Sequence, residues 1–116
     1  MVSIRLYGIP NCDTVKKAKT FLDNAGVDYE FVNFKKVPPT LKLIKDWEKS
    51  LGDLPVNKRG TTFRKIKIDF EEASLDKKRK ILVENSSAIK RPVLEVDGKA
   101  IEIGFQKEDW QNLKLS

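Results

Sequence analysis

With 116 residues, the chain has the size of one domain and can bury a core without disulfides or metals. One cysteine and no histidine exclude an intramolecular disulfide, Cys–His and Ser–His nucleophile pairs, and histidine-based metal sites. A net charge of +6 favours anionic partners, and no apolar run approaches the roughly 20 residues of a membrane span. We therefore expect a cytoplasmic protein with no metal site and no membrane partner.

The chain opens with the pattern of a strand followed by a helix. Apolar residues around Leu6 predict a short strand, and the turn residues Gly8-Ile9-Pro10-Asn11 end it. A helix is predicted from Asp13, because apolar residues recur at intervals of three and four, and Gly26 stops it. The apolar positions of this helix are Val15, Ala18, Leu22 and Ala25.

A second strand is predicted directly after this helix. Val27, Tyr29 and Phe31 alternate with charged residues, which is typical of a strand with one buried face. The helix between the two strands is a crossover, so the strands should be parallel. Residues 3–34 are thus predicted to form a β-α-β unit.

The segment of about 38–88 is predicted to be all-helical. A first amphipathic helix ends at Gly52 and has apolar side chains at Leu41, Ile44, Trp47 and Leu51. Two more helices follow, with expected caps at Thr61 or Thr62 and at Ser74. The expected inward-facing residues of the last of these helices are Leu75, Ile81 and Leu82.

A hairpin and a final helix complete the predicted order. The strands 93–96 and 100–103 flank Asp97-Gly98, a strong signal for a two-residue turn, and Trp110 and Leu113 indicate the last helix. This order predicts an α/β, thioredoxin-like (glutaredoxin-like) fold. The expected architecture is a single domain over 1–116, with a mixed sheet of about four strands and an all-helical insert between the second and third strands.

Cys12 lies between the first strand and the first helix. The first N–H groups of a helix lack partners and carry partial positive charge, so a thiolate there is stabilised and its pKa falls. Asn11 is expected to donate a hydrogen bond to the sulfur or to a substrate, whereas the carboxylate of Asp13 would raise the pKa of the thiol. The alternative, a small buried apolar residue, is disfavoured by these polar neighbours. Because Val15 replaces the second cysteine of a C-x-x-C pair, the resolving thiol must come from another molecule.

Two arginines are candidate anion ligands. Arg91 precedes Pro92, at the place where thioredoxin-like folds usually have a cis-proline facing the active-site cysteine; the alternative is an ordinary turn with a surface arginine. Arg59 lies in the basic turn Lys58-Arg59-Gly60, and its guanidinium can bind a carboxylate or oxyanion bidentately. The alternative is a solvated loop or a phosphate-backbone contact. No nucleic-acid-binding motif accompanies Arg59, so we expect no direct nucleic-acid binding.

Several segments together resemble the arsenate reductase (ArsC)/Spx/YffB superfamily, and most closely its YffB-like subgroup. The resemblance extends from residue 3 to about 113. The segments are Tyr7-Gly8-Ile9-Pro10-Asn11-Cys12-Asp13-Thr14-Val15-Lys16-Lys17-Ala18, Arg59-Gly60-Thr61-Thr62, Ile89-Lys90-Arg91-Pro92-Val93-Leu94 and Gly104-Phe105.

The resemblance implies roles for individual residues. Cys12 matches the family's nucleophile, and Arg59 and Arg91 match two arginines with which arsenate reductases bind oxyanion. A third arginine of those enzymes is replaced here by Gly104, although Lys107 is close enough in sequence to substitute for it. The subgroup implies a glutathione-dependent thiol reductase with glutathione as co-substrate, no bound cofactor, and glutaredoxin as a further partner.

Two other functions stay open from the resemblance. The first is arsenate reduction itself, coupled to glutaredoxin. The second is a Spx-like transcription regulator that binds the RNA polymerase alpha subunit. Spx proteins usually carry a C-x-x-C pair, which this chain lacks.

Overall fold

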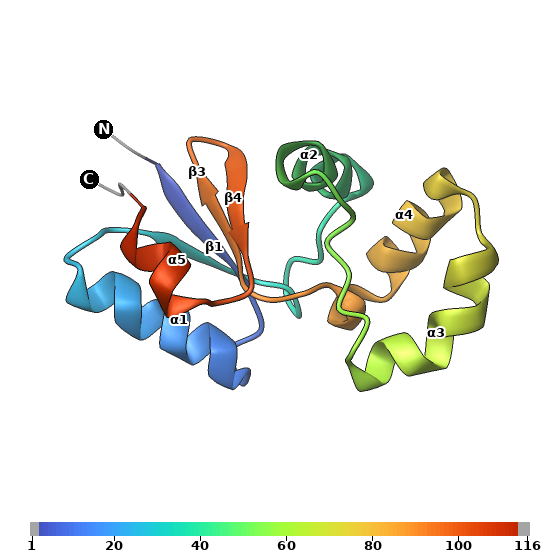
Figure 1. Ribbon diagram of the computed structural model, residues 1–116, viewed down its shortest axis with the longest axis horizontal. Coiled ribbons are helices and arrows are strands. Elements are labelled where there is room, and N and C mark those ends of the chain that lie inside the picture. The colour runs from blue at the N-terminus through green and yellow to red at the C-terminus, as the bar shows by residue number, and fades with distance from the viewer. Residues whose placement is uncertain (1–2, 114–116) are drawn as a thin grey trace.

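A four-stranded mixed sheet forms the centre of the structure, a computed structural model that describes residues 3–113 (Figure 1). The strand order is β2-β1-β3-β4, with β1 parallel to β2, and with β3 antiparallel to both β1 and β4. The strands are β1 (Ile4–Gly8), β2 (Glu30–Asn33), β3 (Val93–Val96) and β4 (Lys99–Ile103). The predicted thioredoxin-like α/β fold and the parallel pairing of the first two strands are confirmed.

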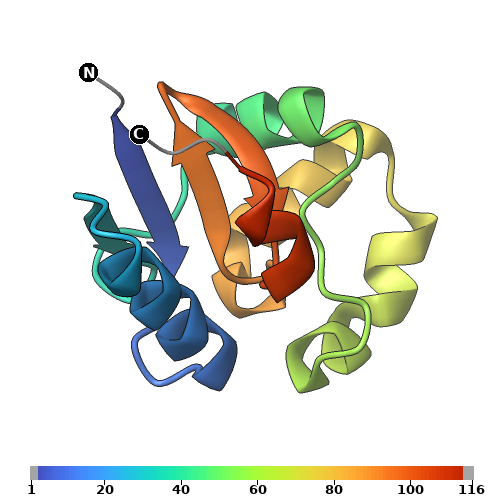
Figure 2. The same ribbon diagram turned by 60° about the vertical axis from the view of Figure 1, so that its left-hand side comes forward.

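Helices cover both faces of this sheet. Figures 1 and 2 show α1 and α5 on one face, α2 on the other, and α3 and α4 beyond the end of the sheet. Their bounds are α1 (Asp13–Asn24), α2 (Leu41–Leu51), α3 (Thr61–Glu72), α4 (Leu75–Glu84), the 3-10 turn η1 (Ser86–Ala88) and α5 (Lys107–Gln111). The predicted helices between the second and third strands are therefore present. Within residues 3–113, no helix has the length and apolar character needed to cross a membrane.

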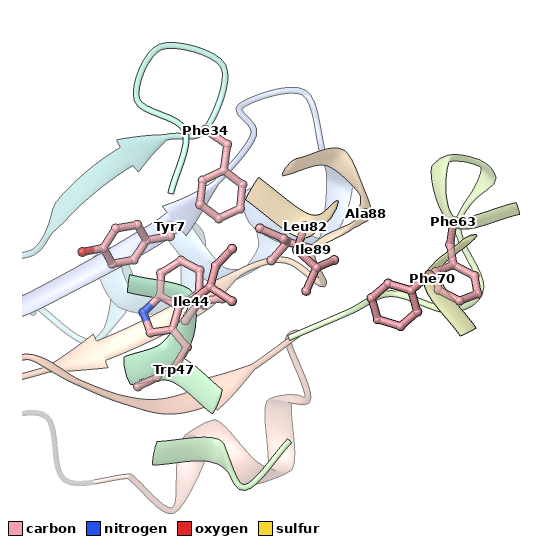
Figure 3. Close-up of a cluster of buried hydrophobic side chains, with 11 residues drawn as sticks. Tyr7, Phe34, Ile44, Trp47, Phe63, Phe70, Leu82, Ala88 and Ile89 are labelled. Atoms are coloured by element: carbon pink, nitrogen blue, oxygen red, sulfur yellow. The ribbon is translucent and has the colours of Figure 1, made fainter. Parts of the chain in front are cut away.

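Alternation along the strands divides the core into two clusters. Leu6 of β1 and its partner Leu94 of β3 belong to the cluster under α1 and α5, together with Ala18, Leu22 and Trp110. The next pair, Tyr7 and Val93, belongs to the cluster under α2 (Figure 3). One face of β1 and β3 thus packs against α1, and the other face packs against the helical segment between β2 and β3.

The second cluster contains a buried carboxyl group. Glu95 of β3 is 3% exposed, and its two oxygens accept hydrogen bonds from the Tyr7 hydroxyl at 3.1 Å and from the Trp47 indole N–H at 2.7 Å. The rings of Tyr7 and Trp47 also meet edge to face, 4.9 Å apart. A single side chain therefore joins β1, β3 and α2.

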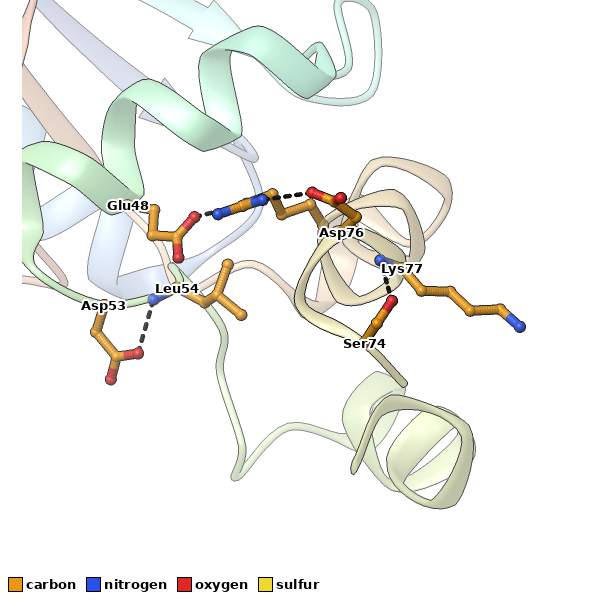
Figure 4. A network of polar contacts seen from close by, with 7 residues as sticks. Glu48, Asp53, Leu54, Ser74, Asp76 and Lys77 are labelled. Atoms are coloured by element: carbon orange, nitrogen blue, oxygen red, sulfur yellow. Dashed lines mark hydrogen bonds and ion pairs between the residues drawn. The ribbon is translucent and has the colours of Figure 1, made fainter. Parts of the chain in front are cut away.

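An ion-pair network fixes α4 against α2. The Arg79 guanidinium lies 2.7 Å from a carboxylate oxygen of Glu48 in α2 and 2.7 Å from one of Asp76 in α4 (Figure 4). Because the Arg79 and Glu48 side chains are only 17% and 20% exposed, this contact is better shielded than an ordinary surface pair.

Some element bounds differ from the sequence prediction; the fourth strand, for example, begins at Lys99 rather than at residue 100. The second strand begins at Glu30 rather than Val27, because the Val27 N–H donates to the Leu22 carbonyl (3.2 Å) and so belongs to the turn that ends α1. Leu113, expected in the last helix, lies beyond the end of α5, where its N–H donates to the Trp110 carbonyl.

The predicted caps give a mixed outcome. Ser74 caps α4 as predicted, since its hydroxyl accepts from the Lys77 N–H at 3.3 Å. The prediction for α3 is wrong. Its N-cap residue is Gly60, and Thr61 is the first residue of the helix, so the Thr61 hydroxyl does not cap it. Leu75, expected to face inward, is 49% exposed because it occupies the first position of α4.

We predict that Glu95→Ala lowers the free energy of unfolding by about 3 kcal/mol, because it leaves two buried donors without an acceptor. Tyr7→Phe removes one donor and leaves the other bond in place, so it should cost about 1 kcal/mol. Urea denaturation followed by tryptophan fluorescence measures both. Equal stability of Glu95→Ala and the wild type would contradict a structural role for this carboxyl group.

Candidate functional site

Cys12 is the N-cap residue of α1, with extended backbone angles (φ −91°, ψ 124°). Its N–H donates to the Ile9 carbonyl and its carbonyl accepts from the Lys16 N–H, which fixes the turn between β1 and α1. Gly8 allows α1 to approach the strand, because a Cβ at this position would lie 2.7 Å from Cγ2 of the buried Val15. The glycine and the tight turn therefore place the thiol at the end of β1.

The environment of Cys12 favours its thiolate. Partial burial raises the pKa of the thiol, but the backbone N–H groups of Val15 and Thr14 and the guanidinium of Arg91 more than offset this effect. The pKa of Cys12 consequently lies below the ordinary value for cysteine. This direction agrees with the activated thiol that the sequence predicts.

Arg91 lies beside the thiol, at the start of β3. The Arg91–Pro92 peptide bond is cis, as predicted. One end of the guanidinium is anchored, since Nη1 donates to the Ser87 carbonyl at 3.0 Å. Its Nε is buried and has no hydrogen-bond partner among the described residues.

Cys12 and Arg91 open into a polar hollow of about 270 Å³. Backbone hydrogen bonds hold its walls: the Asn57 N–H donates to Ala88, and the Gly104 N–H donates to Pro92. The lining residues come from the start of α1, the loop before α3, the segment before β3 and the segment after β4. They are Cys12, Thr14, Asn57, Lys90, Arg91, Gly104, Phe105 and Gln106.

The hollow carries positive charge. Lys90 and Arg91 are its charged lining residues, and no carboxylate belongs to the lining within residues 3–113. With the free N–H groups at the start of α1, these two cations make a site suited to a carboxylate, a sulfonate or an oxyanion.

Two predicted ligands lie outside this hollow. Asn11 is exposed and is absent from the lining. Arg59 is also exposed; its N–H donates to Oδ1 of Asn57, which does line the hollow, but its guanidinium does not. The structure thus brings Cys12 and Arg91 together in the hollow, whereas Pro92 follows Arg91 without lining it, and it places Arg59 on a neighbouring turn.

Lys90, rather than Lys107, is the second cation of the hollow. A Cβ built on Gly104 would lie 2.8 Å from Cε and 3.5 Å from Nζ of Lys90, and Gly104 has a φ of +73°. The lysine side chain therefore occupies the space that a side chain at position 104 would enter, and the backbone there disfavours any residue other than glycine.

Sequence reasoning missed the contributions of Asn57, Lys90 and Gln106. Asn57 carries a local signal, because Asn at the start of a turn commonly bonds to the N–H two residues later. That signal indicates a turn and gives no information about which turn lies beside Cys12. Lys90 and Gln106 are likewise brought to the thiol by the pairing of β3 with β1 and β4.

The model of the ArsC family matches residues 7–113, a range that includes every lining residue of the hollow. The chain belongs to the ArsC family. The hollow beside Cys12 therefore lies within the part of the chain that the family model matches.

Solved structures and other proteins resemble this chain over most of its length. The solved structure of a YFFB protein has a TM-score of 0.84 and 35% identity, covering 94% of this chain and 96% of that one. An arsenate reductase (ArsC) related protein from Brucella melitensis has a TM-score of 0.72 and 36% identity, covering 94% and 92%. The global transcriptional regulator Spx 2 of Bacillus anthracis is 29% identical over 108 residues, covering 90% of this chain and 81% of the relative.

We predict that the alkylation rate of Cys12 by iodoacetamide rises with pH through a midpoint below that of a model cysteine peptide, because only the thiolate reacts. Arg91→Ala removes a positive charge that lowers the pKa of the thiol, so its midpoint should move to higher pH. Arg64→Ala, an exposed arginine of α3, is the matched control and should not move it. A wild-type midpoint equal to that of the peptide would contradict an activated thiol.

Proposed function

We propose that this protein is a glutathione-dependent thiol reductase. The observation that carries the proposal is the position of Cys12: its thiol has a lowered pKa and opens, beside Arg91, into a hollow that favours anions. A nucleophilic thiol and a nearby anion site are the two elements that reaction with a charged thiol compound requires.

The proposed reaction has two exchange steps. In the first, the Cys12 thiolate attacks one sulfur of a substrate disulfide; the S–S bond breaks, a mixed disulfide forms on Cys12, and the other half leaves as a thiolate. In the second, a glutathione thiolate attacks the substrate sulfur of the mixed disulfide and releases Cys12 as a thiolate. Glutathione, or glutaredoxin in its place, supplies the resolving thiol because the chain has one cysteine.

Each neighbouring group has a proposed role in these steps. The N–H groups of Thr14 and Val15 stabilise Cys12 both as attacking and as leaving thiolate. The guanidinium of Arg91 and the ammonium of Lys90 bind a carboxylate of glutathione or substrate. In this proposal Asn11 and Arg59 contact the ligand from outside the hollow, with Arg59 closing over it from the turn that Asn57 holds.

We predict that Arg91→Ala weakens glutathione binding by roughly 10- to 100-fold, the effect of losing one charged hydrogen-bonding partner. Arg91→Lys should also weaken it, because a lysine cannot reproduce the fork of the guanidinium. Arg59→Ala should have a smaller effect, and the exposed Arg64→Ala none. Calorimetric titration on the Cys12→Ser background, in which no exchange occurs, measures all four.

A turnover assay with glutathione and a neutral aliphatic disulfide, bis(hydroxyethyl) disulfide, completes the test. Cys12→Ser should be inactive. Unchanged glutathione affinity in Arg91→Ala, or turnover by Cys12→Ser, would contradict the proposal.

Arsenate reduction is the second candidate, because the Brucella melitensis relative is described as arsenate reductase related. We predict that arsenate turnover is roughly 10²–10³-fold below that of an arsenate reductase run in parallel, since a preorganised donor is absent at Gly104. Lys90 places an ammonium near that position, but a point charge does not provide the bidentate geometry of an arginine. Comparable turnover by the two enzymes would favour arsenate as the substrate.

The likeness to Spx 2 supports a third candidate, a regulator that binds the RNA polymerase alpha subunit. A pulldown with that subunit distinguishes it from the reductase, because stable capture without glutathione-dependent turnover favours the regulator. The single cysteine disfavours the disulfide-based switching that a C-x-x-C pair would provide.

A further inference from the structure

A second depression, which we call the aromatic groove, lies between α1 and the segment that follows β4. Its volume is about 410 Å³, and it is lined by Lys16, Lys17, Thr20, Phe21, Asn24, Phe105 and Lys107. The rings of Phe21 and Phe105 lie 5.9 Å apart, and both pack against the buried Trp110 at 5.9 and 5.0 Å. The two phenylalanines are only partly buried, so apolar ring surface is held rigidly at a solvent-facing site.

The aromatic groove lies next to the hollow at Cys12. Phe105 lines both depressions, with the thiol in one and Phe21 in the other. On α1, positions 16, 20 and 24 are spaced by four and therefore follow one face of the helix, beginning four residues after the N-cap Cys12. The groove thus extends along about 12 Å of α1, from Lys16 to Asn24.

The charges of the aromatic groove have one sign. Lys16 and Lys17 of α1 and Lys107 of α5 belong to its lining, and within residues 3–113 no carboxylate does. The Thr20 hydroxyl donates to the Lys16 carbonyl, so it is engaged with the helix backbone. An occupant that matches this surface has an aromatic body and at least one negative charge.

The sizes of the two depressions point to one ligand that uses both. Sites for complete small ligands have volumes of about 300–1,000 Å³, and the hollow at Cys12, at about 270 Å³, falls below this range. It accommodates the reacting sulfur and a small anionic group. The aromatic groove, at about 410 Å³, has room for the organic part attached to that sulfur.

We infer that the substrates of Cys12 are disulfides of aromatic thiols that carry a carboxylate or sulfonate, with the ring resting on the solvent-facing surface of Phe21 and Phe105 and the acid group facing the three lysines. This inference rests on the proposed thiol reductase function and names its substrate class. Cys12 attacks the sulfur attached to the seated ring; the disulfide bond breaks, and the other aromatic thiolate leaves. Glutathione then resolves the mixed disulfide as described above.

The test compares two aromatic disulfides on the full-length protein. Dithiobis(nitrobenzoate) is anionic, dithiodipyridine is neutral, and both release a coloured thiol when Cys12 attacks. With the anionic reagent the rate should saturate with concentration, and Lys16→Gln/Lys107→Gln should slow it by about fivefold or more. The same variant should leave the rate with dithiodipyridine unchanged. Lys42→Gln/Lys45→Gln, two exposed lysines of α2, removes the same net charge elsewhere and is the matched control.

Phe105→Leu tests the aromatic contact and should lower the rate of reaction of Cys12 with both aromatic reagents. The thermal melting of this variant is measured to show that it is folded. A second readout avoids thiol chemistry: nitrobenzoate added to the Cys12→Ser protein should shift the NMR signals of Phe21, Phe105 and Lys107. The inference would be overturned if both lysine double variants lowered the rate with dithiobis(nitrobenzoate) equally, or if nitrobenzoate shifted no NMR signals of the groove residues. Turnover of bis(hydroxyethyl) disulfide, which has no aromatic ring and no charge, tests the proposed reductase function separately. If this turnover is present but the groove results are negative, only the substrate class is contradicted.

Discussion

The unpaired backbone N–H groups at the start of α1 are the feature on which the site depends. They stabilise a thiolate only if the sulfur stays at the N-cap, and the turn from Ile9 to Cys12 and the close contact of Gly8 with Val15 keep it there. The same contact brings α1 against the sheet, where the helix packs on the buried side chains of Leu6 and Leu94. The packing of the first core cluster and the reactivity of the thiol are therefore consequences of one local arrangement.

The second half of the site comes from the other end of the chain. Pairing of β3 with β1 carries Lys90 and Arg91 to the thiol, and the Glu95 bonds to Tyr7 and Trp47 hold β3 in register with β1 and α2. A positively charged hollow results from segments that are about 80 residues apart in the sequence. The two cations of the hollow therefore lie next to Cys12 only when β3 is paired with β1.

Features with strong local causes could be predicted from the sequence. The Asp97-Gly98 turn, the period of α1 and the Ser74 cap each depend on a few neighbouring residues, and the structure confirms them. The expected thioredoxin-like fold predicts the cis bond before Pro92, which local patterning leaves open. The position of Lys90 beside Gly104 could not be predicted, because it depends on side-chain packing between two segments that pair only in the folded sheet. The start of β2 was misplaced because Val27 has an apolar side chain but a backbone engaged in the end of α1.

The central claim is that Cys12 carries the substrate as a mixed disulfide that an external thiol resolves. Intact-mass spectrometry of acid-quenched protein tests it most directly. After incubation with a disulfide substrate, the protein should gain the mass of one substrate thiol at Cys12, and glutathione should then remove that mass and restore the free thiol. Turnover without any such adduct, or an adduct that persists in the presence of glutathione, would contradict the account.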